Sequence, residues 1–282
     1  MSEEKAAPRL VEVPGPTALG GGFRRFFELL WLIAVNDFKK TYFGTVLGYV
    51  WSLLRPLALF AVLLFVFTRI FRIGSEVEYY PVLLLFNIVM ISFFQEATIG
   101  SVASVVNQES LVRKTRFPRL VIPLAVVLTG LFNFGTNLVA VVIFIIAFGV
   151  PVTWTWLLFP IIVLALFIFT MAMAMLLSAL YVRFRDVGII WSVLVTALFY
   201  ATPVLYPIEV VPPQYVDWIM INPLTPIFEQ ARHWVIDPSA PGAVAVAGSY
   251  WALLPPIGIY IAVCVAGVLV FRREAPRIAE EL

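Results

Sequence analysis

Residues 154–182 read WTWLLFPIIVLALFIFTMAMAMLLSALYV, an apolar run that contains no charged side chain. About 20 apolar residues are enough for a helix to cross the hydrocarbon core of a bilayer. This run is longer, so it predicts a membrane-spanning helix. The composition of the whole chain agrees, because 62% of its 282 residues are hydrophobic and 13% are charged. A soluble domain has about 25% charged residues.

Similar apolar segments flank this run on both sides. They predict five further spans, at about residues 46–67, 81–105, 120–148, 187–205 and 251–271. Residues 149–153 are too few for anything but a hairpin between the third and fourth spans. The sequence therefore predicts an all-α integral membrane domain of six transmembrane helices over residues 46–271.

The segments outside this domain differ in composition. Residues 1–22 are charged and rich in proline and glycine, without the apolar core of a secretory signal, and predict a flexible tail. Residues 23–45 combine apolar residues at helical spacing with interrupting charges, which predicts an amphipathic helix at the membrane interface; the alternative is a packed helix of a small cytosolic domain. Gly44 and Gly48 either let two helices approach closely or loosen the elbow before the first span. Residues 272–282 form a second tail.

Residues 206–250, between the fifth and sixth spans, interrupt the pattern of long apolar runs. They contain seven prolines and two short amphipathic pieces, at 214–221 and 226–236. Neither piece is long enough to cross a membrane. Irregular backbone at membrane depth survives only where other protein covers it, so we expect short helices that dip into one leaflet or lie on its surface.

Lysine and arginine are distributed unevenly over the two sides of the predicted domain. With six spans, 16 of the 19 Lys and Arg residues lie on the side of the termini, whereas Arg69, Arg72 and Arg232 lie on the other. Basic residues are enriched in cytoplasmic loops. The sequence therefore predicts a plasma-membrane protein with both termini in the cytoplasm. Adding or removing one span would scatter the basic clusters over both sides.

The residues present argue against several kinds of chemistry. A phosphate-binding loop has a glycine directly before its lysine, and none of the four lysines follows a glycine. His233 is the only histidine, so we expect no metal site and an interfacial role beside Trp234. A net charge of +2 gives no indication of nucleic-acid binding. Glu96 is an isolated carboxylate within an apolar span, and we expect it to pair with a basic residue rather than to carry protons.

Two short loops on the basic side mix charged with apolar residues. Residues 107–119 read NQESLVRKTRFPR, a pattern that fits about two helical turns ended by Pro118. Arg183-Phe-Arg-Asp186 is a tight turn between two spans. Such tips suit a plug that inserts into a cleft of another protein. The alternative is that these arginines only set the topology and extend toward the membrane surface.

Several motifs follow one another in order along the chain from about residue 24 to the last span: Asp37-Phe-Lys-Lys-Thr-Tyr42, Val46-Leu-Gly-Tyr-Val-Trp51, Leu54-Arg-Pro56, Ser110-Leu-Val-Arg-Lys-Thr-Arg-Phe-Pro-Arg-Leu120, Val182-Arg-Phe-Arg-Asp186, Thr202-Pro-Val-Leu-Tyr-Pro207 and Asn222-Pro-Leu-Thr-Pro226. Together they resemble the permease subunit of ABC-2 type exporters that move O-antigen, teichoic acid or galactan.

The resemblance implies a half-transporter that pairs as a homodimer, binds a separate ABC ATPase in a 2:2 complex and exports lipid-linked polysaccharide for the cell envelope. The chain would be no enzyme and hold no cofactor, since the ATPase would bind ATP and Mg. Residues 206–250 would form an outward-facing lid. The implied ATPase contacts are a coupling helix at 108–117 and the turn at 183–186, with Glu109, Leu111, Arg113, Lys114, Arg116, Phe117, Arg183, Phe184, Arg185 and Asp186 as candidate residues.

A sugar polymer presents hydroxyls and apolar C–H faces, so its pathway needs aromatic planes and neutral polar groups. The candidate channel residues are Tyr49, Asn133, Asn137, Tyr200 and Tyr206, although aromatic residues in membrane proteins also serve packing and interfacial belts. The candidate substrate-entrance residues on the interface helix are Arg24, Arg25, Lys39, Lys40 and Tyr42. The basic ones meet either the pyrophosphate of a lipid carrier or anionic membrane lipid.

Two other functions compete with this one. An ABC-2 permease for a drug or a lipid often has larger extracellular loops than the roughly dozen residues that follow the first span here. A membrane-embedded enzyme acting on lipid-linked sugars would need paired acids or a metal site at the interface, and no such pair stands out.

Overall fold

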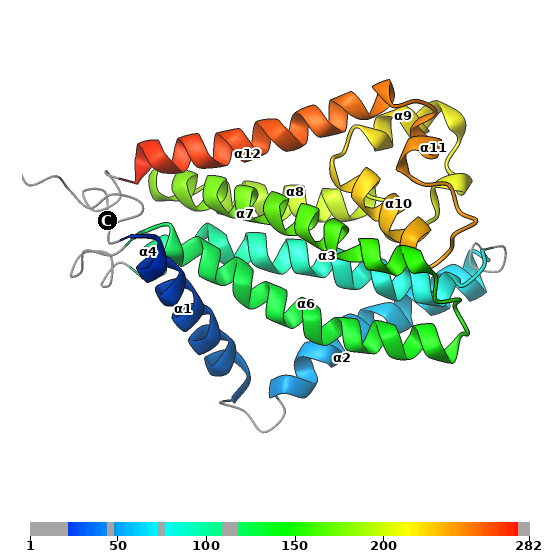
Figure 1. Ribbon diagram of the computed structural model, residues 1–282, viewed down its shortest axis with the longest axis horizontal. Helices are drawn as coiled ribbons and strands as arrows, with labels where there is room; N and C mark the ends of the chain where they lie inside the picture. The colour runs from blue at the N-terminus through cyan, green and yellow to red at the C-terminus, as the bar shows by residue number, and fades with distance from the viewer. Residues whose placement is uncertain (1–21, 44–47, 73–76, 109–117, 276–282) are drawn as a thin grey trace, which may run out of the picture.

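The computed structural model describes residues 22–43, 48–72, 77–108 and 118–275, and within these ranges the chain is helical without any strand. Five helices are long and apolar enough to cross a membrane, and a shorter apolar helix accompanies them. Figure 1 shows them as an elongated bundle with the helices running roughly along its long axis. The predicted all-α membrane fold is confirmed.

The spanning helices follow the predicted order, with shifted ends. They are α2 (Gly48–Phe65, continued by a π-helical turn Val66–Ile70), α3 (Tyr80–Val102), α6 (Val121–Ala147), α7 (Phe159–Arg183, preceded by a 3₁₀ turn Trp154–Leu158) and α12 (Leu254–Glu274, preceded by a 3₁₀ turn Trp251–Leu253). The predicted second span is divided, since α3 ends at Val102 and the short helix α4 (Ser104–Asn107) follows it.

Helix α8 (Val187–Ala201) differs most from the expected span at 187–205. At about 1.5 Å per residue, its 15 residues extend about 22 Å, which is shorter than the ~30 Å hydrocarbon core. It ends at Thr202, which has extended backbone, because Pro203 follows and disfavours helical backbone at the residue before it. The remaining expected residues form an irregular segment packed against α3.

Helix α3 lies at the centre of the bundle (Figure 1). The ten consecutive residues from Val82 to Ile91 are all buried, so this part of α3 is enclosed on every side, whereas Glu96 and Ile99 farther along the helix are exposed. Helices α6 and α7 pack on it, while α2 is largely exposed outside this core. An all-round apolar helix is expected at the centre of a larger assembly, and here the neighbouring helices bury it within one chain.

A compact group of short helices closes one end of the bundle. It comprises α9 (Pro213–Met220), α10 (Leu224–Val235) and α11 (Ala243–Ala247), with a 3₁₀ turn at Ile208–Val210. We call residues 202–250 the cap; it lies at the right of Figure 1. The two amphipathic pieces predicted in this region are therefore helical, and neither extends the length of the bundle.

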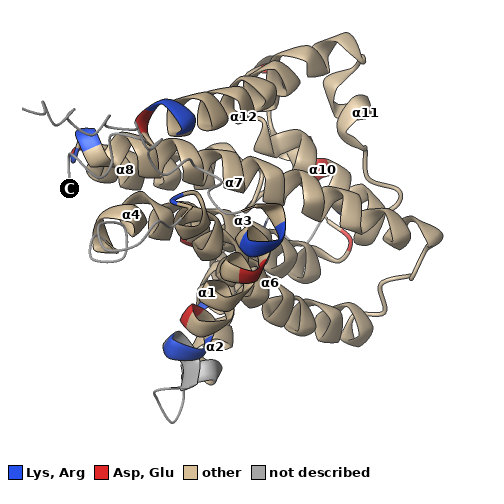
Figure 2. Ribbon diagram, turned by 60° about the vertical axis from the view of Figure 1, so that its left-hand side comes forward, with Lys and Arg blue, Asp and Glu red and all other residues tan. Residues whose placement is uncertain are grey.

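The opposite end of the bundle carries most of the basic side chains, and we call it the basic end. Helix α1 (Phe23–Phe43) begins there, and α7 and α12 end there with arginines in their last turns. Figure 2 shows Lys and Arg at the ends of these helices and tan ribbon over most of the length between them. Charged residues thus gather where a membrane's polar surface would lie.

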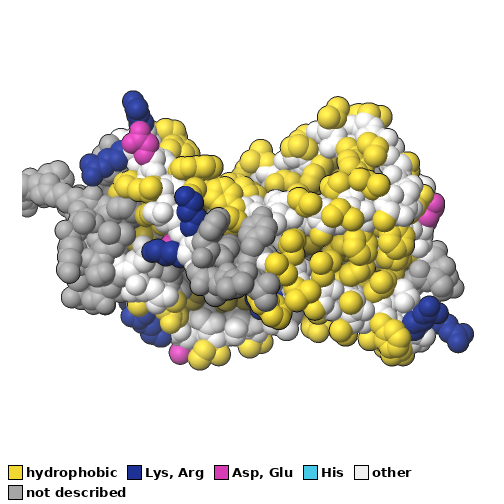
Figure 3. Space-filling view, turned by 90° about the horizontal axis from the view of Figure 1, so that it is seen from below, with side chains coloured by type: hydrophobic (Ala, Val, Ile, Leu, Met, Phe, Trp, Pro, Cys, Tyr) yellow, Lys and Arg dark blue, Asp and Glu magenta, His cyan; other side chains and the backbone are white. Residues whose placement is uncertain are grey.

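Hydrophobic side chains cover the length of the bundle. Figure 3 shows one such face, with a broad hydrophobic area over the part away from the basic end and Lys or Arg side chains toward the ends. Exposed residues of α2 and α6, among them Val62, Phe65, Val139 and Ile143, contribute to the apolar surface. A soluble monomer rarely exposes so large an apolar area, so this surface suits lipid or another membrane-embedded chain.

Candidate functional site

The turn between α7 and α8 projects from the basic end. Arg183, Phe184, Arg185 and Asp186 are all exposed, and the Phe184 side chain leaves 53% of its surface uncovered. The Arg185 guanidinium lies 5.2 Å from the centre of the Tyr181 ring, a cation–π contact that orients it. An exposed aromatic ring between two arginines suits contact with another protein.

The first predicted contact loop lies largely outside the described residues. Glu109, Leu111, Arg113, Lys114, Arg116 and Phe117 fall in residues 109–117, as does the expected coupling helix except for Gln108. The ends of this loop are described. Val105 of α4 and Val121 and Ile122 of α6 pack in one cluster with Phe26 of α1 and Val182 of α7. The structure therefore brings the ends of both predicted contact loops together with the start of α1.

Helix α1 packs across α6 instead of standing apart from the bundle (Figure 1). Thr129 Oγ1 of α6 lies 3.1 Å from the Ala34 carbonyl oxygen, to which it can donate, and the Phe132 ring makes edge contacts with Trp31 and Phe38. The opposite face of α1 leaves apolar side chains such as Leu32 exposed. This arrangement fits a helix that is held by the bundle and meets lipid with its free face.

The basic residues predicted for the substrate entrance lie at two separate places on α1. Arg24 and Arg25 begin α1, and Arg24 pairs with Glu28 at 2.9 Å. Lys39 and Lys40 lie near its other end, fourteen residues after Arg25, about 21 Å along the axis. A continuous helix keeps the two pairs apart, so one phosphate group cannot contact both. Tyr42 belongs to α1, but its side chain lies outside the described part of the chain.

The candidate channel residues form two local pairs. Asn137 of α6 donates from Nδ2 to the Asn133 backbone carbonyl at 3.0 Å. The Tyr206 hydroxyl donates to the Tyr200 carbonyl at 3.1 Å, and the Tyr200 ring is exposed at the end of α8. Tyr49 belongs to α2, and its side chain is not described. The first pair lies on α6 and the second at and after the end of α8, and among the described residues no contact brings the two pairs into one site.

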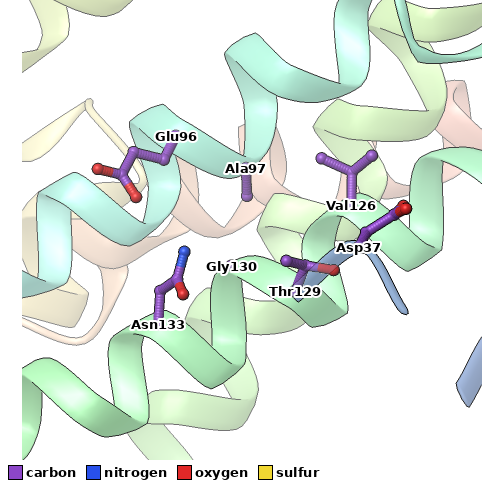
Figure 4. A pocket seen from close by; sticks show the side chains of 7 residues that line it. All are labelled: Asp37, Glu96, Ala97, Val126, Thr129, Gly130 and Asn133. Carbon is purple, nitrogen blue, oxygen red and sulfur yellow. The ribbon is translucent and has the colours of Figure 1, made fainter. Parts of the chain in front are cut away.

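A polar pocket of about 240 Å³ lies where α1, α3 and α6 meet. We call it the α1–α3–α6 pocket. Its lining residues are Asp37 from α1, Glu96 and Ala97 from α3, and Val126, Thr129, Gly130 and Asn133 from α6. Figure 4 shows Asn133 reaching from α6 toward the opening beneath Glu96, with Asp37 and Thr129 on the far side of Gly130. Burial raises the pKa of the Asp37 carboxyl, and the nearby Lys40 opposes this shift.

Glu96 has the basic partner that its sequence context predicts. Its Oε1 lies 4.0 Å from Arg55 Nη1 of α2. The side chains are 44% and 83% exposed, respectively. An exposed ion pair at this separation contributes about 0–1 kcal/mol to the free energy of unfolding. The pair therefore does little for stability, and both side chains stay accessible to a ligand or a second chain.

Polar residues of α3 stabilise the irregular segment after α8, and their role is not predicted by the sequence analysis. Asn87 Nδ2 donates to the Pro203 carbonyl at 3.1 Å, and the Tyr80 hydroxyl donates to the Leu205 carbonyl at 2.7 Å. These bonds satisfy carbonyls that the break in helix α8 leaves without helical partners. The available signal is Asn87, a polar residue within the apolar first half of the span, together with Tyr80 directly before the predicted span.

A second missed feature is a buried charged cluster in the cap. Arg232 Nη1 of α10 lies 2.7 Å from Glu209 Oε2 and 3.8 Å from Glu229 Oε2. Arg232 Nη2 lies 3.9 Å from Asp237 Oδ2. Three carboxylates thus share one guanidinium. Burial raises the pKa of Glu229 to about 8, Arg232 opposes this, and Glu209 adds to it. Glu229 is therefore largely protonated at neutral pH, and the cluster joins three separate segments of the cap.

His233, next to this cluster, has a structural partner. Its Nδ1 lies 2.7 Å from the Ala240 carbonyl oxygen, so the ring ties α10 to the segment before α11. Among the described residues, no group of three or more His, Cys, Asp and Glu side chains is placed to hold a metal ion.

Comparison of the sequence with known proteins identifies a transporter family. The family model described as "ABC-2 type transporter" matches residues 28–235. An O-antigen export system permease protein RfbA of Myxococcus xanthus is 32% identical over 198 residues, which cover 70% of this chain and 75% of the relative. Two proteins of that name from Klebsiella pneumoniae are 28% and 27% identical, each over 70% of this chain and 76% of their own length. The match runs from α1 through the bundle to α10 in the cap, and the chain belongs to the ABC-2 type transporter family.

Proposed function

We propose that this chain is the membrane permease subunit of an ATP-driven exporter of lipid-linked polysaccharide. The observation that carries the proposal is its similarity over 70% of its length to permeases named for O-antigen export. The family match supports a transporter that works with an ABC ATPase. Teichoic acid and galactan are related cargoes that the same proposal includes.

The energy for transport comes from a separate subunit, which binds ATP and Mg. The described arrangement at the basic end supports this proposal, because the exposed turn Arg183–Asp186 projects beside the ends of the 109–117 loop and the start of α1. A rigid cluster under these elements would pass motion of the ATPase to α6 and α7. We therefore place the basic end, and both termini, in the cytoplasm, and the cap outside a bacterial inner membrane.

The chain acts as a homodimer in a 2:2 complex with its ATPase. Helix α2 supports this part of the proposal, since it is the spanning helix with the least burial. Helix α2 also carries the exposed Arg55, which pairs with Glu96 of α3 between the two ends of the bundle. A charged side chain avoids lipid and faces other protein or water. A polar pathway between this chain and a second copy of it would provide such an environment for Arg55.

Affinity purification of the tagged chain in mild detergent tests the proposal. We expect an ABC ATPase to copurify, the complex mass to fit two copies of each subunit, and the complex to hydrolyse ATP. Arg185→Glu, in the exposed turn, should weaken ATPase copurification severalfold, because it reverses a charge at the proposed contact. Arg69→Glu, an exposed arginine near the other end of the bundle, is the matched control and should copurify the ATPase normally.

The cargo is tested separately in cells depleted of the chain. Lipid-linked polysaccharide should accumulate on the cytoplasmic side and its surface display should fall. Normal display together with increased sensitivity to drugs would favour an ABC-2 exporter of another cargo. Turnover of lipid-linked sugars by the purified chain alone, with no ATPase partner, would instead support a membrane-embedded enzyme.

A further inference from the structure

The α1–α3–α6 pocket has the size of a site for one small group. Its 240 Å³ would hold about eight waters at ~30 Å³ each. That is below the ~300 Å³ at which sites for drug-sized ligands begin. The floor is made by close packing of small residues, because a Cβ added at Gly130 would lie 3.2 Å from the Ala97 Cβ. The pocket thus suits a single ring or headgroup rather than a length of polymer.

The pocket walls offer hydrogen-bonding groups from three helices. Asp37 and Glu96 contribute carboxylates, and Asn133 contributes an amide. Asn133 Oδ1 is buried, whereas the side-chain nitrogen of Asn133 points toward the opening beneath Glu96 (Figure 4). A ligand hydroxyl can therefore donate to a carboxylate and accept a hydrogen bond from the Asn133 nitrogen.

The charges around the pocket favour a neutral ligand. Lys40 acts on Asp37, and Arg55 lies beside Glu96, so each carboxylate already has a cation near it. An additional cation is not needed for charge balance, whereas an anionic phosphate would face two carboxylates. A group that is uncharged and rich in hydroxyl donors matches both the acceptors and the balanced charge.

We propose that the α1–α3–α6 pocket binds one neutral sugar unit through its hydroxyl groups. The identification of this sugar as part of the exported cargo rests on the proposed function. The sugar's hydroxyls donate to the Glu96 carboxylate and accept from the Asn133 side-chain nitrogen, and its apolar face lies over Ala97, Gly130 and Val126. Because α1 forms one wall, occupancy of the pocket links the sugar to the helix whose start packs beside the predicted ATPase contacts.

The test measures lipid binding to the complex of this chain with its ATPase in phosphatidylcholine nanodiscs. The probe is radiolabelled monoglucosyl diacylglycerol, a neutral sugar lipid, and diacylglycerol without sugar and anionic phosphatidylglycerol are the comparison ligands. We expect the wild-type complex to bind the sugar lipid at least tenfold more tightly than diacylglycerol. Competition by free glucose separates recognition of the sugar alone from recognition of a lipid-linked sugar.

Asn133→Leu and Glu96→Gln should each reduce sugar-lipid affinity at least tenfold without changing phosphatidylglycerol binding. Glu96→Gln keeps the side-chain volume, so it tests the pocket even if Asn133→Leu disturbs packing. Thr136→Val is the matched control on α6, since the Thr136 hydroxyl bonds to its own helix at Phe132 and does not line the pocket. It should bind the sugar lipid within about twofold of wild type.

Equal binding of sugar lipid and diacylglycerol by the wild type would overturn the proposal. So would wild-type affinity in both pocket variants. Neither result would affect the proposed export function, which is judged by ATPase copurification and polysaccharide display. The opposite outcome is also distinguishable. If the variants lost sugar-lipid binding but the protein exported no polysaccharide, the sugar site would be supported and the proposed cargo would be rejected.

Discussion

A close contact between α7 and α12 provides a quantitative test of the packing of the bundle. Gly267 of α12 faces Ala172 of α7, and a Cβ added at Gly267 would lie 2.5 Å from the Ala172 carbonyl oxygen. Ordinary contact begins at 3.4 Å, so the added atom would be about 0.9 Å too close to rigid backbone. Glycine at this position lets the two helix backbones approach, as small residues do in membrane bundles.

Gly267→Ala should therefore force α7 and α12 apart. Overpacking of this kind costs about 1–3 kcal/mol. Alanine also recovers about 0.5–1 kcal/mol because it favours helix over glycine, which leaves a net loss of up to about 2.5 kcal/mol. The control is Gly258→Ala on the same helix, where an added Cβ would meet nothing within 4 Å. That variant should be neutral or slightly stabilised.

The assay compares the apparent melting temperatures of the two purified variants in one detergent. The folded fraction after heating is measured by size-exclusion chromatography with fluorescence detection. At about 2–4 °C per kcal/mol for a chain near this size, Gly267→Ala should melt up to about 10 °C below wild type, and Gly258→Ala should melt at or above it. If Gly267→Ala melted at the same temperature as Gly258→Ala, the close α7–α12 contact would not exist in solution.

Three further predictions concern the cap and its support. Glu229 has a pKa of about 8 in the fold and an ordinary value of 4.5, so the folded protein holds a proton that the unfolded chain releases. Stability should fall as pH rises from about 4.5 to 8, by at most ~1.4 kcal/mol per pH unit, and melting curves of Glu229→Gln should lack this slope. Arg232→Met would leave the carboxylates of the cap cluster without their shared cation and should cost about 3 kcal/mol or more at pH 7; its melting temperature should recover partly on acidification, and a pH-independent loss would contradict the cause given. Tyr80→Phe removes the donor to the Leu205 carbonyl and should cost about 1–3 kcal/mol, seen as faster proteolysis of the cap; unchanged digestion would show that this bond does not hold it.

The candidate site was only partly predictable from the sequence. Asp37 and Asn133 lie 96 positions apart in the chain, and only the packing of α1 across α6 brings them to one pocket. Likewise, Arg24 and Lys39 were grouped as one basic cluster by composition, whereas the straight length of α1 separates them. The partner of Glu96 was predicted by type, as a basic residue, and the structure identifies it as Arg55.

The break after α8 shows where local pattern fails to describe the backbone. Residues 187–205 are apolar enough to be read as one span, although Pro203 already indicates an interruption. Whether such a chain bends, unwinds or continues depends on which groups donate hydrogen bonds to its freed carbonyl oxygens. Here the donors, Tyr80 and Asn87, come from more than a hundred residues earlier.

The sequence by itself determined that this chain resides in a membrane, about where its helices cross, and which end of the bundle is basic. These properties depend on the length, hydrophobicity and charge of each segment, which are local. Only the tertiary structure decided that α3 is central, that α2 is exposed, and that polar groups from three helices meet in one pocket. Helices that are apolar on every side carry no signal for which neighbour they contact, because lipid and protein bury such surfaces almost equally well.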